Sequence, residues 1–91
     1  MATIAVWLKI DEERVIPALQ EAETKLDGIE GDLLLDFSSV GWIDASVLQK
    51  MEELAGIADD KGVKVGLRGV NVKIYKVLKL MKLASRFSFV N

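Results

Sequence analysis

The sequence predicts one α/β domain spanning residues 1–91, with elements in the order β-α-β-α-β-α-β and a mostly parallel four-stranded sheet on which the helices pack. Two observations support this fold class. Short apolar runs typical of strands alternate with longer segments whose apolar residues recur at helical spacing. A chain of 91 residues is also the size of a single domain, and its hydrophobic share of 51% supplies a core.

The first strand is expected over residues 3–9, where the side chains alternate between two faces. A helix follows, and Pro17 suits its first turn because the N–H that proline lacks is not needed there. Asp27 and Gly28 end this helix. Residues 32–37 then form a short apolar run without alternation, which is typical of a central strand covered on both faces.

The next two helices are recognised by their caps. Asp44 is the expected N-cap of a helix over residues 45–60, in which the apolar residues fall on one face. Gly62 stands where a helix commonly has its C-terminal cap. Asn71 is the expected N-cap of the last helix.

Two further strands are expected at residues 63–67 and 86–90, before and after the last helix. That helix carries four lysines away from its apolar face, which ordinarily indicates a solvated surface. The functional alternative is a surface for an acidic partner or an anionic membrane. The four are Lys73, Lys76, Lys79 and Lys82.

The composition excludes several classes of function. The chain has no cysteine and no histidine, so it lacks disulfides, the usual zinc and copper ligands and the commonest general base. We therefore expect no enzyme activity, no metal and no cofactor. The pI near 5.1 argues against a nucleic-acid partner. The sequence shows neither a basic leader nor an apolar run of ~20 residues, so we expect a cytoplasmic protein without membrane insertion.

The net charge of −2 conceals a split along the chain. All 14 acidic residues lie at or before Asp60, whereas eight of the 12 basic residues follow it. Such a split marks a charged partner surface if the halves stay apart in space, but the fold averages it if they interleave. We expect the halves to interleave.

Several motifs together resemble one known family. An apolar strand ends on an aspartate in LLLDF (residues 33–37), and a turn leads to WIDASVL (residues 42–48) at the start of an amphipathic helix. Gly62 and a further strand follow at the family's spacing. This order resembles the STAS domain, a family named for sulfate transporters and anti-sigma factor antagonists. The family signature Asp-Ser-Ser-Gly reads Asp-Ala-Ser-Val here.

The resemblance implies a bacterial regulatory module that binds other proteins. Ser46 matches the serine that is phosphorylated in anti-sigma factor antagonists, which act in transcription regulation and bind a serine kinase or an anti-sigma factor. The chain would then be a signalling phosphoprotein. The alternative is a STAS subunit without phosphorylation that docks onto a transport ATPase of the ABC type, or onto another signalling complex. The first strand would also leave an exposed edge at which two copies could pair as a homodimer.

The resemblance places the partner surface around the start of the second helix. A phosphate on Ser46 would meet unpaired N–H groups and the positive end of the helix dipole, whereas the alternative is an ordinary small residue at a helix start. Asp36 is expected to accept N–H groups of the turn that follows it, and Trp42 is expected to be buried. The predicted surface comprises Asp36, Ser38, Ser39, Trp42, Asp44, Ala45, Ser46 and Val47.

Overall fold

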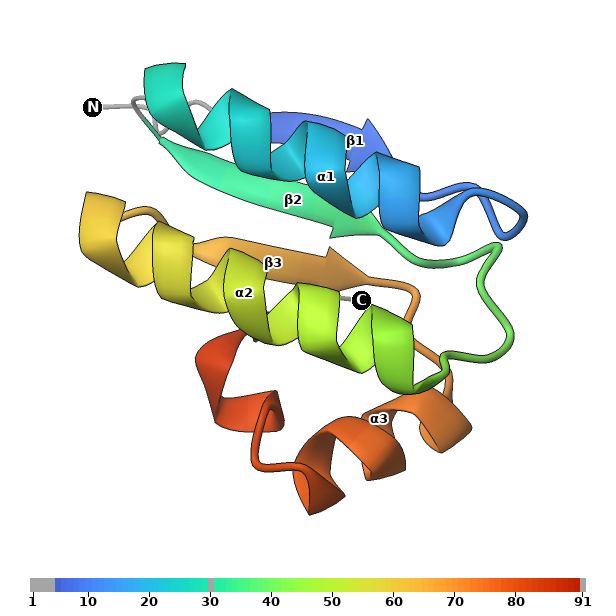
Figure 1. Ribbon diagram of the computed structural model, residues 1–91. Coiled ribbons are helices and arrows are strands. Elements are labelled where there is room, and N and C mark those ends of the chain that lie inside the picture. Colours follow the sequence, from blue (N-terminus) through green and yellow to red (C-terminus); the bar gives the residue numbers. More distant parts are fainter. Residues whose placement is uncertain (1–4, 30, 91) are drawn as a thin grey trace.

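The computed structural model describes residues 5–29 and 31–90, and in this part of the chain strands and helices alternate as predicted (Figure 1). The strands are hydrogen-bonded in sequence order, and all three neighbouring pairs are parallel. The predicted mostly parallel sheet is therefore confirmed. Its strands are β1 (Ala5–Lys9), β2 (Asp32–Asp36), β3 (Val65–Arg68) and β4 (Ser88–Val90).

The helices are close to their predicted bounds. They are α1 (Val15–Lys25), α2 (Ala45–Lys61) and α3 (Val72–Leu80), with short 3-10 turns at Leu26–Gly28 and Ala84–Arg86. Helix α1 begins two residues before Pro17, which is tolerated because the first four N–H groups of a helix lack intrahelical partners. Residues 3 and 4 of the expected first strand lie outside the described residues.

The predicted caps are confirmed. The Asp44 side chain accepts a hydrogen bond of 2.9 Å from the N–H of Val47, and the Asn71 side chain accepts one of 2.8 Å from the N–H of Ile74. Gly62 ends α2 in the left-handed conformation with φ of 68°. Each of these residues acts through a hydrogen bond or a backbone conformation that involves only its near neighbours in the sequence. The sequence alone could therefore locate these helix ends.

Helices α1 and α2 lie over the same face of the sheet (Figure 1). The strand side chains that point toward them, such as Leu33, Leu35 and Leu67, are fully buried in the core. Leu34 points the other way and is only partly buried, and its neighbour in the register, Trp7, is 50% exposed. The expectation that β2 is covered on both faces is therefore wrong, because the helices that follow β1 and β2 both pack on one side.

Candidate functional site

The segment between β2 and α2 forms a firmly held loop. Phe37 is fully buried, and its N–H donates a hydrogen bond of 2.7 Å to the carbonyl of Arg68. As predicted, the Asp36 carboxylate accepts a hydrogen bond of 2.9 Å from the N–H of Ser38. That bond, followed by one from the Ser38 hydroxyl, holds the pKa of Asp36 below its usual value. The start of the loop is thus fixed by its own residues and by β3.

The connection from β3 to α3 holds the rest of the loop. The Asn71 side-chain amide donates a hydrogen bond of 3.2 Å to the carbonyl of Gly41, thirty residues away. Gly69 has φ of 72°, and a Cβ at this position would lie 2.8 Å from Ser38 Cα. Glycine therefore permits a close approach of the two backbones that any side chain would prevent.

Trp42 lies on the exposed side of this loop, with 65% of its surface accessible. The prediction that it is buried is wrong. Its neighbours Val40 and Ile43 enter the core instead, so the side chain between them points to solvent. Trp42 borders a hollow of about 520 Å³, whose other walls include Glu13, Pro17 and Asp44. The loop therefore presents a large aromatic side chain on a rigid support.

The first turn of α2 continues this surface. Ala45 and Ser46 are exposed, whereas Val47 is buried against the core. Val47 replaces the glycine of the STAS signature, and because its side chain points inward it does not cover the Ser46 hydroxyl. Asp44 caps the helix through Val47, so the N–H groups of Ala45 and Ser46 remain at the open end of α2.

Of the eight predicted surface residues, four are exposed on the consecutive stretch that ends the loop and begins α2. Trp42, Asp44, Ala45 and Ser46 are exposed there. Asp36 and Ser38 instead border a second hollow of about 570 Å³, which lies over the ends of β3 and β4 and beside α3. Ser39 is half-buried and Val47 is part of the core.

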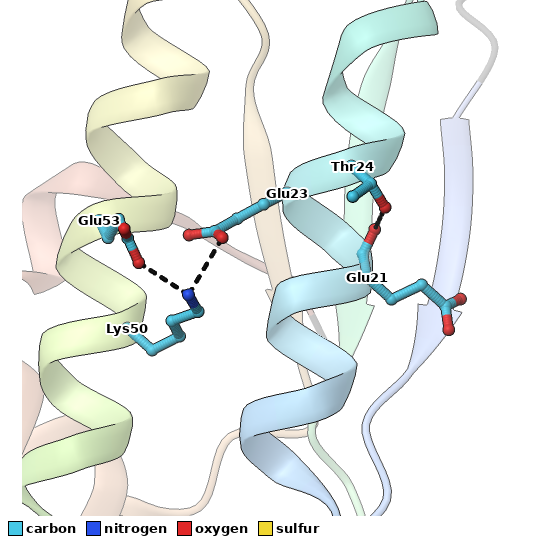
Figure 2. Close-up of polar contacts among 5 residues, drawn as sticks. All are labelled: Glu21, Glu23, Thr24, Lys50 and Glu53. Carbon is cyan, nitrogen blue, oxygen red and sulfur yellow. Dashed lines mark hydrogen bonds and ion pairs between the residues drawn. The ribbon is translucent and has the colours of Figure 1, made fainter.

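Sequence reasoning missed a charged cluster between α1 and α2 (Figure 2). The Lys50 ammonium lies 3.2 Å from Glu23 Oε1 and 2.8 Å from Glu53 Oε2. Burial raises the pKa of Glu23, the nearby charge of Glu53 adds to this, and Lys50 opposes it. Lys50 and Ser46 border the same groove, of about 590 Å³, one helical turn apart. The sequence did contain a sign of this cluster. Glu23 follows Ala22 and lies one turn after Leu19, both of which are buried, and a carboxylate so close to the core needs a cation or a hydrogen-bond donor.

Within residues 5–29 and 31–90, no group of three or more acidic side chains could hold a metal ion. No helix in the described chain is long and apolar enough to cross a membrane.

No family model matches the chain. The chain is 30% identical over 81 residues to the intermembrane phospholipid transport system binding protein MlaB of Escherichia coli (strain K12). The match covers 89% of this chain and 80% of MlaB, and the Shigella flexneri protein of the same name gives the same values.

Three solved structures share the fold. The STAS domain of a SulP transporter from Vibrio cholerae has a TM-score of 0.76 at 21% identity, covering 99% of this chain and 75% of that domain. An RsbS variant from Moorella thermoacetica has a TM-score of 0.75 at 21% identity, with 98% and 84% covered. An anti-sigma-factor antagonist (STAS) domain protein from Planctomyces limnophilus has a TM-score of 0.70 at 14% identity, with 90% and 70% covered.

Proposed function

The chain belongs to the MlaB family of STAS-domain proteins, and from this we propose that it is a small non-catalytic binding subunit that docks onto the ATPase of a transport system. The observation that carries the proposal is the 30% identity to MlaB, which spans 80% of that binding protein. Of the two functions that the sequence left open, this favours the docking subunit over the regulator of transcription.

The surface around Trp42 supports a docking role. An exposed tryptophan is a common anchor of protein interfaces, because its large ring buries much apolar area at little entropic cost. Trp42 also needs no rearrangement to bind, since Phe37 and Asn71 hold its loop to the β3–α3 side of the domain. The adjacent hollow would receive a side chain of the partner.

The proposal is tested by expressing an affinity-tagged chain in its source organism and identifying the proteins that co-purify with it. We expect an ATP-hydrolysing subunit of a transport system. With that subunit purified, Trp42→Ala should weaken binding by about thirtyfold, the typical effect of losing a central aromatic anchor. Trp7→Ala is the matched control, because Trp7 is also exposed but pairs in register with Leu34, whose side chain points away from the face of the sheet that α1 and α2 cover.

Recovery of a kinase or an anti-sigma factor in place of a transport ATPase would favour the regulator of transcription over the docking subunit. An equal loss of binding in both tryptophan variants would show that the anchor is misplaced. A similar far-ultraviolet circular dichroism spectrum in all three proteins ensures that the comparison concerns binding and not folding.

A phosphate switch at Ser46 is the second candidate, favoured by one observation. The Ser46 hydroxyl is exposed in the first turn of a capped helix, next to the surface around Trp42. A phosphate there would add a charge of about −1.5 to −2 at the edge of the docking surface. The same purified chain, weighed intact, should then show an increment of one phosphate that disappears in Ser46→Ala. An unmodified mass during both growth and stress would leave Ser46 as a residue of the helix start.

A further inference from the structure

The outward face of α3 combines apolar and basic side chains. Ile74 and Leu78 bury the helix against the core. Val72, Lys76 and Leu80 are spaced at i, i+4 and i+8, so they form one stripe on the opposite side. At the two ends of this stripe Val72 is 69% exposed and Leu80 is 80% exposed. A helix that belongs only to a soluble surface would ordinarily carry polar residues at both positions.

Lysines surround this stripe without local compensation. Lys73 and Lys79 lie on either side of it, and Lys82 follows at the turn after the helix. Residues 61–91 contain no acidic side chain. Two cations of the basic half do reach the acidic half, through Lys61–Asp27 at 2.6 Å and Arg86–Asp59 at 2.7 Å. The α3 lysines take part in no ion pair among the described residues. Interleaving therefore averages the charge split only in part.

We propose that α3 and the turn at Met81 and Lys82 form a surface that adsorbs to an anionic lipid bilayer at the level of its headgroups. The lysines would attract acidic headgroups, while Val72, Leu80 and the half-exposed Met81 would enter the boundary with the acyl chains. The chain would lie on the membrane without crossing it. The area buried is small, so binding would be reversible and would weaken with salt.

The residue types favour a lipid surface over an acidic protein. Lysine is depleted in the cores of protein interfaces, where arginine and aromatic residues are preferred. Here all four cations of the surface are lysines, and the apolar residues that it comprises, Val72, Leu80 and Met81, are not aromatic. The aromatic residue of α3, Tyr75, is 41% exposed, but its ring packs edge-on against Phe89 with ring centroids 5.0 Å apart. Long flexible cations around exposed aliphatic side chains are typical of interfacial helices.

This inference goes beyond the proposed docking function and uses a different surface. The docking residues lie on the loop before α2, whereas the lipid surface lies on the outward side of α3. Asn71 joins the start of α3 to Gly41 in that loop, so the two surfaces keep a fixed relative orientation. A domain bound to a transport ATPase through one surface would then rest on the membrane through the other.

The test is flotation of the purified full chain with vesicles of phosphatidylcholine alone and of phosphatidylcholine mixed with phosphatidylglycerol. We expect binding only to the mixed vesicles, with loss at high salt. Lys76→Gln combined with Lys79→Gln should weaken it by about 25-fold, since each lysine near an anionic surface contributes about fivefold. Lys25→Gln combined with Lys64→Gln is the matched control, because it removes the same charge from exposed positions outside α3.

The apolar contribution is tested separately with Leu80→Ser, which should weaken binding to the mixed vesicles severalfold. Equal binding to both vesicle types, no binding to either, or equal losses in the two lysine pairs would overturn the proposal. Binding that depends on the lysines but is unchanged in Leu80→Ser, and that poly-glutamate matches in affinity, would also overturn it and indicate an acidic protein segment. None of these outcomes depends on whether Trp42 docks onto an ATPase.

Discussion

Replacing Lys50 with methionine would test how strongly the cluster between α1 and α2 ties these helices together. Methionine keeps most of the volume and the helix propensity of lysine, so the change removes mainly the charge. Lys50 and Glu23 retain side-chain exposures of only 17% and 13%. Without Lys50, the Glu23 carboxylate would face the groove with no cation at hydrogen-bond distance among the described residues (Figure 2).

The magnitude follows from the separation and the burial of the pair. Two unit charges 3.2 Å apart attract by about 5 kcal/mol at an effective dielectric constant of ~20, and the loss of hydration of both groups offsets most of this. An exposed ion pair contributes about 0–1 kcal/mol, and breaking a fully buried one costs about 3–5 kcal/mol. Because the two side chains are shielded by their neighbours but border a groove that is open to solvent, screening keeps the cost below that of a fully buried pair, and we expect the unpaired Glu23 left by Lys50→Met to lower the free energy of unfolding by about 1–2 kcal/mol.

A double-mutant cycle measured by urea denaturation isolates this interaction. Glu23→Gln should restore most of the stability lost in Lys50→Met, because a neutral amide no longer needs the cation. We expect a coupling of about 1–2 kcal/mol between Glu23 and Lys50. The matched control is the cycle of Asp27→Asn and Lys61→Met, an exposed pair at 2.6 Å whose coupling should stay below about 0.5 kcal/mol. Equal couplings in the two cycles would refute the reasoning.

The pH dependence gives a second check on the same variant. Burial raises the pKa of Glu23 above its ordinary value of 4.5, so the folded state binds this proton more tightly than the unfolded state. Stability from this group is therefore fully present below the ordinary pKa and is lost as the pH rises through the folded value. Lys50 lowers this pKa, so Lys50→Met removes that effect. The stability that the variant loses relative to the unsubstituted protein should therefore grow as the pH rises above 4.5. A stability loss in Lys50→Met that does not change with pH would show that the ionisation of Glu23 is not its cause.

Two further predictions concern the loop and the start of α2. Asp44→Ala should lower the free energy of unfolding by about 1 kcal/mol and the melting temperature by about 4–8 °C. Asp44→Asn should retain most of the stability, because the amide oxygen can still accept the hydrogen bond from Val47 N–H. Equal melting curves for the two variants would count against the cap. In urea denaturation, Gly69→Ala should lower the free energy of unfolding more than Gly62→Ala does. Both glycines have positive φ, but only at Gly69 would a Cβ meet the backbone of Ser38, at 2.8 Å. Equal losses would show that the backbones of Gly69 and Ser38 can move apart to accept a side chain.

The parts of the fold that the sequence predicted depend on local chemistry. The caps at Asp44 and Asn71 and the glycine that ends α2 are fixed by hydrogen bonds or backbone conformations within a few residues. The alternation of strands and helices follows from periodicity, and a parallel sheet follows from that alternation. These features need no knowledge of which distant segments meet.

The features that the sequence did not predict depend on distant contacts. Whether Trp42 is buried depends on which side chains of its segment pack into the core. Here Val40 and Ile43 occupy the core, and Trp42 stays exposed. Glu23 finds Lys50 only because α1 and α2 pack side by side on the sheet. A one-dimensional pattern gives the face of a helix but not the residue that will stand opposite it.

The same dependence on distant contacts bears on the proposed docking loop. Its shape is set by Gly69 and Asn71, about thirty residues later in the chain, which let the β3–α3 connection press against Ser38 and hold Gly41. An exposed aromatic residue on a flexible loop would lose part of its binding energy to ordering, whereas the backbone next to Trp42 is already held at Gly41 by this hydrogen bond. The specificity of the proposed surface would therefore depend partly on residues that touch no partner. Substitutions at Gly69 or Asn71 should weaken docking even where they leave the fold intact, because they release the support on which Trp42 stands.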